Sequence, residues 1–100
     1  MGPWAVKFHP EAVEEARAAH QWYAERSVAA AEAFMAEFDA GVERISNSPE
    51  ICPPYLHGTR RYLFKRFPFL LVFRQMDDSL EVIAVAHGRR KPGYWRKRTD

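Results

Sequence analysis

The chain of 100 residues contains one cysteine, Cys52, and therefore no partner for an internal disulfide. No metal-ligand spacing surrounds Cys52, so a zinc site is not expected. No apolar run approaches the ~20 residues that a membrane-spanning helix needs. The apolar segment at residues 4–8 is short and contains Lys7, unlike a signal peptide. We therefore expect a soluble cytoplasmic protein without a metal, a cofactor or a membrane partner.

Acidic residues are missing from the long stretch between Glu50 and Asp77, and the charge is divided unevenly. Residues 1–56 carry four basic and nine acidic side chains, a net charge of -5, whereas residues 57–100 carry eleven basic and four acidic ones, a net charge of +7. This asymmetry predicts an acidic partner for the second half, either a nucleic acid or an acidic protein segment. A solvated basic surface is the alternative.

The chain is long enough for a single domain, and the period of its apolar residues changes twice, from strand to helix and back to strand. Alternation over residues 4–8 predicts a short strand, and Pro10 begins a helix that extends to about residue 26. Ser27 is a candidate N-cap for a second helix over residues 28–45. An irregular segment, 46–58, leads to three predicted strands over residues 60–66, 69–75 and 80–87. The last of them is apolar on both faces, as in a central strand.

This order predicts an α+β domain over residues 1–100, with two layers in the order β-α-α-β-β-β. A helical hairpin would pack on one face of a mainly antiparallel four-stranded sheet and leave the other face partly open. The inward stripe of the first helix is predicted to be Ala12, Ala16, Ala19 and Tyr23, with Glu14, Glu15 and Arg17 outside. The inward stripe of the second helix is predicted to be Ala31, Phe34, Phe38, Val42 and Ile45.

A basic segment follows the last predicted strand at residues 89–100, after His87 and Gly88. It combines arginines and lysines with Tyr94 and Trp95, which suits contacts with phosphates or with an acidic protein. Tyr94 and Trp95 could instead fold back and cap the sheet. Similarly, His87 at the end of a central strand could be a structural histidine.

Several patterns along the chain are similar to the RelE/ParE family of bacterial type II toxin-antitoxin toxins, often called plasmid stabilisation proteins. They are Trp22-Tyr23 with Arg26, Phe34 with Phe38, Arg60-Arg61, Arg66-Phe67-Pro68-Phe69, and the closing His87-Gly-Arg-Arg-Lys-Pro-Gly-Tyr-Trp95. The resemblance extends from Val6 to Arg98. It implies a small toxin that is neutralised by a cognate antitoxin protein, with which it would form a hetero-oligomer. RelE-like members cleave messenger RNA on the ribosome, whereas ParE-like members act on DNA gyrase.

The nuclease branch implies roles for four residues. RNA cleavage through the 2'-hydroxyl needs a base, an acid and cations around the phosphorane. By analogy, Arg61 and Arg90 would stabilise the phosphate, and His87 or Tyr94 would transfer protons, without a metal ion. Whether or not the chain is a nuclease, other basic and aromatic residues are expected to bind the antitoxin or the target. These are Arg60, Lys65, Arg66, Arg74, Arg89, Lys91 and Trp95.

Two departures from the pattern of the nuclease branch favour the ParE-like branch. A carboxylate base is expected near the first strands of the meander, yet no Asp or Glu lies between Glu50 and Asp77, and Lys65 is the only lysine between Cys52 and Val85. The Gly-Arg-Arg run after His87 resembles ParE more closely. The sequence therefore favours a ParE-like growth inhibitor acting on gyrase, with a ribosome-dependent messenger RNA endoribonuclease as the alternative.

Overall fold

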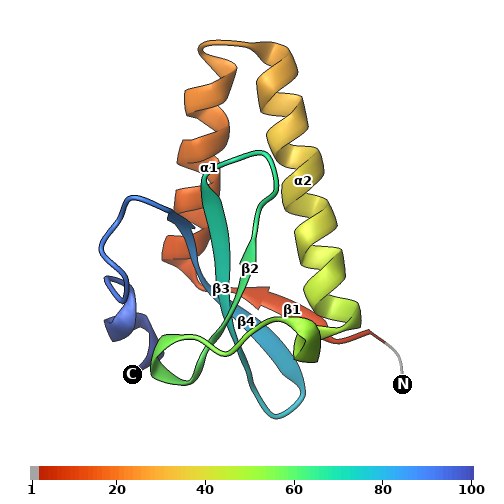
Figure 1. Ribbon diagram of the computed structural model, residues 1–100, viewed down its shortest axis with the longest axis vertical. Helices are drawn as coiled ribbons and strands as arrows, with labels where there is room; N and C mark the ends of the chain where they lie inside the picture. Colours follow the sequence, from red (N-terminus) through yellow and green to blue (C-terminus); the bar gives the residue numbers. More distant parts are fainter. Residues whose placement is uncertain (1–2) are drawn as a thin grey trace.

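The computed structural model describes residues 3–100, in which two long helices pack against one four-stranded sheet. Figure 1 shows α1 and α2 side by side as a helical hairpin, as predicted. The elements are β1 (Ala5–Phe8), α1 (Pro10–Ala24), α2 (Val28–Asn47), β2 (Arg60–Leu63), β3 (Phe69–Gln75) and β4 (Ser79–His87), with short 3-10 turns η1 (Pro49–Ile51), η2 (Leu56–Gly58) and η3 (Arg96–Thr99). Within the described chain, no helix is both long and apolar enough to cross a membrane.

The helix boundaries follow from capping at both starts. His9 precedes α1, and its Nδ1 accepts a hydrogen bond from the Glu11 amide at 3.1 Å. Ser27 caps α2, because its hydroxyl oxygen accepts from the Ala30 amide at 3.1 Å, which confirms the predicted cap. An N-cap residue needs an extended backbone. Helix α1 itself ends at Ala24, slightly earlier than predicted.

The sheet has the strand order β1-β4-β3-β2. Strands β2, β3 and β4 form the predicted antiparallel meander, and β1 pairs in parallel with β4. A parallel pair cannot be joined by a tight turn, and here α1, α2, β2 and β3 all lie between β1 and β4 in the chain. The predicted strand 60–66 was too long, because β2 ends at Leu63. The Phe64 amide instead donates to the Phe69 carbonyl at 3.0 Å and closes the turn before Pro68.

The two faces of the sheet bury separate apolar clusters. Helix-facing residues such as Leu71 and Phe73 pack with Phe34 of α2. On the opposite face, Val72 and Ile83 pack under Trp95, whose side chain is 1% exposed. The C-terminal segment therefore covers part of the face that the sequence analysis left partly open. Figure 1 shows this segment, in blue, running from the end of β4 to η3 beside the sheet.

Candidate functional site: a charged cluster and an apolar cleft

Glu15 of α1 is the centre of a cluster of hydrogen bonds, although the helical periodicity placed it outside. Its side chain is 16% exposed. One carboxylate oxygen accepts from the Val85 amide at 3.0 Å and from Arg98 at 2.9 Å, and the other from the Tyr94 hydroxyl at 2.7 Å and from Arg98 at 3.0 Å. The placement outside was wrong because Glu15 lies between the buried Ala12 and Ala19, three and four residues away. Residues at this spacing share a helix face.

The carboxylate of Glu15 gathers cations from the C-terminal segment. The Arg98 guanidinium approaches both carboxylate oxygens, and also donates to the Ile83 carbonyl at 3.1 Å. Glu11 lies 3.6 Å from Arg98, on the exposed side of the pair. Arg90 is a more distant partner, 3.8 Å from the carboxylate of Glu15, and its guanidinium carbon lies 3.7 Å from the centroid of the Tyr94 ring. The cluster thus joins α1, β4 and the chain end.

The phenol of Tyr94 keeps its proton in this environment. Burial is the main cause that raises its pKa above the ordinary value, and the hydrogen bond to Glu15 raises it further. Arg90 and Arg98 act in the opposite direction, since positive charges favour the phenolate. Tyr94 is therefore a hydrogen-bond donor to Glu15 in the folded protein.

His87 lies at the end of β4 with one ring nitrogen engaged. Its Nδ1 accepts from the Arg89 amide at 3.0 Å, and its ring meets that of Phe69 edge-on at a centroid distance of 5.1 Å. Because Nδ1 is an acceptor, the neutral ring carries its proton on Nε2. The hydrogen bond and the packing fix the imidazole at the wall of a cleft.

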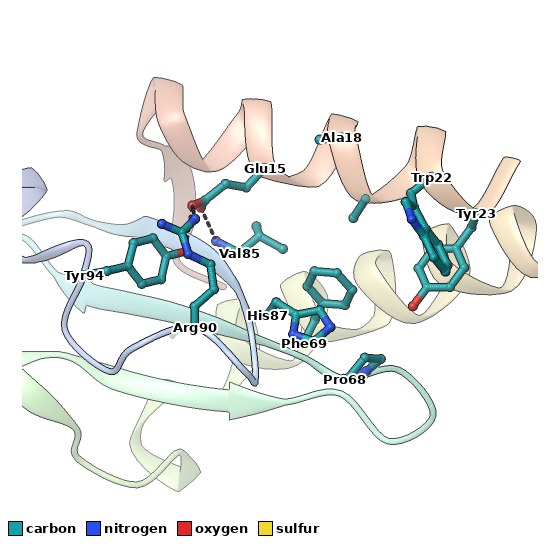
Figure 2. Close-up of a pocket in the computed structure, with 11 residues that line it drawn as sticks. Glu15, Ala18, Trp22, Tyr23, Pro68, Phe69, Val85, His87, Arg90 and Tyr94 are labelled. Carbon is teal, nitrogen blue, oxygen red and sulfur yellow. Dashed lines mark hydrogen bonds and ion pairs between the residues drawn. The ribbon is translucent and has the colours of Figure 1, made fainter. Parts of the chain in front are cut away.

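A cleft of about 480 Å³ opens beside the charged cluster, between α1 and the ends of β3 and β4. Figure 2 shows Glu15, Arg90 and Tyr94 at one end and Trp22 with Tyr23 at the other, with His87 and Phe69 between them. Its remaining lining residues are Ala18, Ala19, Pro68 and Val85. Apolar side chains therefore form most of the wall, and the charge is concentrated at one end.

The structure brings Arg90, His87 and Tyr94 together but separates Arg61 from them. Arg61 pairs in register with Val72, its guanidinium carbon lies 5.1 Å from the Tyr55 ring centroid, and its Nε is buried without a hydrogen-bond partner among residues 3–100. Successive strand residues face opposite sides of a sheet. Arg61 and His87, which is paired with Phe69, consequently do not share a site.

The other basic residues named from the sequence are distributed over several surfaces. Arg60 donates to the Cys52 carbonyl at 2.5 Å. Arg74 pairs with Glu81 at 3.0 Å and donates to the Thr99 carbonyl at 2.9 Å. The backbone amides of Lys65 and Arg66 donate to the Glu37 carboxylate. The strands therefore do not gather all the cations into one patch.

Three further residues named from the sequence belong to the C-terminal segment. Arg89 and Lys91 are exposed beyond β4. Trp95 is buried in the second apolar cluster and meets the His57 ring at a centroid distance of 5.8 Å. Its indole is thus part of the core and not of a binding surface, which matches the alternative in which this segment caps the sheet. No group of three potential metal-binding side chains occurs in residues 3–100.

Comparison with known proteins shows that a solved structure shares this architecture. A solved structure described as the chromosomal ParDE toxin-antitoxin system from P. aeruginosa superposes with a TM-score of 0.73 at 15% identity, covering 84% of this chain and 95% of that one. The helical hairpin packed on a four-stranded sheet is thus a fold that this chain shares with that structure. The chain belongs to the family described as ParE toxin of type II toxin-antitoxin system, parDE, whose model matches residues 6–92. No curated protein matches it in sequence.

Proposed function

We propose that this ParE-like toxin inhibits growth by binding DNA gyrase and does not cleave RNA. The observation that carries the proposal is that the residues suited to RNA cleavage are not organised as a catalytic set. Tyr94 donates to Glu15, His87 accepts from the Arg89 amide, and Arg61 lies on the other face of the sheet.

Electrostatics support the same conclusion. A nuclease must stabilise a phosphorane with cations aimed at the point where negative charge develops. Here the buried fork of Arg98 is directed at a carboxylate of the protein itself. The Arg98 fork is thus occupied by that carboxylate and not free for a phosphate, and the raised pKa of Tyr94 makes the phenol a poor base at neutral pH. A toxin that acts by binding needs none of these groups to be free.

A cognate antitoxin is the second proposed partner. The solved structure that matches this fold is described as a ParDE toxin-antitoxin system, and residues 57–100 carry the net charge of +7 that an acidic segment would complement. Affinity carried by these charges should fall as salt is added. Binding that is unchanged in concentrated salt would show that apolar burial carries the complex.

The test compares two activities of the purified chain. We expect it to inhibit supercoiling by gyrase, and we expect no new 5' ends in primer-extension maps of transcripts from translating ribosomes. His87→Ala should inhibit supercoiling as the parent chain does, since the proposal gives His87 no proton to transfer. Ribosome-dependent cleavage that disappears in His87→Ala would overturn the proposal in favour of the endoribonuclease.

A further inference from the structure

The apolar cleft beside α1 contains one cation whose hydrogen-bonding capacity is not used by the charged cluster. A carboxylate has about four lone-pair positions on its two oxygens. For Glu15 these are occupied by Val85, Tyr94 and both terminal nitrogens of Arg98, at 2.7–3.0 Å. Arg90 stands at 3.8 Å, beyond hydrogen-bonding distance, and its side chain is 53% exposed. Its guanidinium is therefore available to an external anion.

The position of Arg90 is set by an aromatic ring. Its guanidinium carbon lies 3.7 Å from the centroid of Tyr94, and the Tyr94 hydroxyl is fixed by Glu15. Stacking of this kind leaves the edge of a guanidinium, where its N-H donors lie, free for a planar acceptor. Arg90 thus presents a fixed fork at the charged end of the cleft, where a carboxylate would meet it in bidentate geometry.

The opposite end of the cleft suits an apolar group. Trp22 and Tyr23 line it together with small alanines of α1, and Phe69 lies between this end and the charged one. Trp22 is 52% exposed although it is a large aromatic residue, and its ring is held between Tyr23, edge-on at 5.1 Å, and Arg26, whose guanidinium carbon is 3.7 Å from the ring centroid. The volume of about 480 Å³ lies within the usual range of small-molecule sites, ~300–1,000 Å³.

We propose that this cleft binds a small amphipathic carboxylate, an aromatic or branched aliphatic acid whose apolar body lies against Trp22, Tyr23 and Phe69 and whose carboxylate pairs with Arg90. The negative charge of Glu15 does not oppose this ligand, since the Arg98 fork balances it. His87 lines the same cleft, and its Nε2-H is a second donor of the kind that a carboxylate accepts. This site is independent of the proposed action on gyrase.

Titration of the full chain with phenylacetate, followed by amide NMR, tests the site. We expect saturable shifts confined to residues that line the cleft, such as Ala18, Trp22, Val85 and His87, with a dissociation constant on the order of 1 mM for so small a probe. Phenylacetamide has the same shape without the charge. It should bind about tenfold more weakly, because a charge-assisted hydrogen bond is roughly twice as strong as a neutral one.

A pair of variants distinguishes the effect of the Arg90 contact from the effect of net positive charge. Arg90→Gln should weaken phenylacetate binding about tenfold and leave phenylacetamide binding unchanged. Arg89→Gln removes the same charge from the neighbouring residue, whose side chain does not line the cleft, and should bind both probes as the parent chain does. The amide spectra themselves report whether each variant is folded.

Three outcomes would overturn the proposal. Equal affinity for the acid and the amide would remove the role of charge, and equal losses in both arginine variants would reduce the effect to net charge. Binding of the capped dipeptide N-acetyl-Trp-Glu-amide without any binding of phenylacetate would show that the cleft anchors a peptide and not a free acid.

Discussion

Replacing Glu15 with alanine should be among the most destabilising single changes on the surface of α1. The substitution removes the acceptor of the Val85 amide, the Tyr94 hydroxyl and the Arg98 fork. Arg98, with 10% of its side chain exposed, would keep its charge without its nearest carboxylate. Breaking a buried pair by removing one partner costs ~3–5 kcal/mol, and because both side chains retain some exposure we expect about 3 kcal/mol.

The predicted loss is large enough to measure by thermal denaturation. In a domain of this size, 1 kcal/mol changes the Tm by ~4–8 °C, so Glu15→Ala should lower the Tm by roughly 12 °C or more. Circular dichroism at 222 nm follows the two helices directly. The loss should also release the C-terminal segment, because Tyr94, Arg90 and Arg98 all contact this carboxylate.

Glu14 provides a matched control one residue away. It has the same side chain on the same helix, but its partner is the exposed Arg17, and the two side chains are 62% and 58% exposed. Exposed pairs of this kind contribute little, so Glu14→Ala should melt close to the parent chain. Equal melting temperatures for Glu14→Ala and Glu15→Ala would refute the view that Glu15 ties the chain end to α1.

Three further predictions concern Tyr94, Gly41 and Trp95. Because the pKa of Tyr94 is raised, the stability that Tyr94 contributes is complete below the ordinary tyrosine pKa of ~10 and is lost as the pH rises through its folded-state pKa. In an ultraviolet titration, Tyr94 should therefore ionise at a higher pH than the exposed tyrosines, and this late step should be missing in Tyr94→Phe. Alanine favours helices more than glycine does, but Gly41→Ala should lower the Tm, because the new Cβ would lie 2.8 Å from Cε2 of Tyr62. A higher Tm would contradict this close approach. Trp95→Ala should cost ~3–5 kcal/mol, as expected for a large buried aromatic, and a urea midpoint equal to that of the parent chain would contradict its place in the core.

The elements of the fold were accessible from local patterns. The period of the apolar residues predicted both helices and all four strands, and Ser27 marked the second helix start correctly. The errors in the predicted elements lie at their ends. The aromatic run after Leu63 continues the pattern of a strand, but Phe64 turns back to pair with Phe69 and ends β2 early.

The candidate site was only partly accessible from the sequence. The sequence named His87, Arg90 and Tyr94, which are close in the chain, and the structure places all three along one cleft. The carboxylate of Glu15, which contacts Tyr94 and Arg90, was missed, since it comes from a helix more than seventy residues earlier. Its position between Ala12 and Ala19 was the available signal.

Local periodicity and capping, which depend on neighbouring residues, determined from the sequence alone that this chain forms a helical hairpin and a mainly antiparallel sheet. Family motifs spread along the chain likewise indicated a RelE/ParE toxin. Only the tertiary structure decided which charges meet, because an ion pair such as Glu15 with Arg98 depends on the packing of α1 against β4 and the chain end. It also decided that Trp95 belongs to the core, since the burial of a side chain depends on what folds over it.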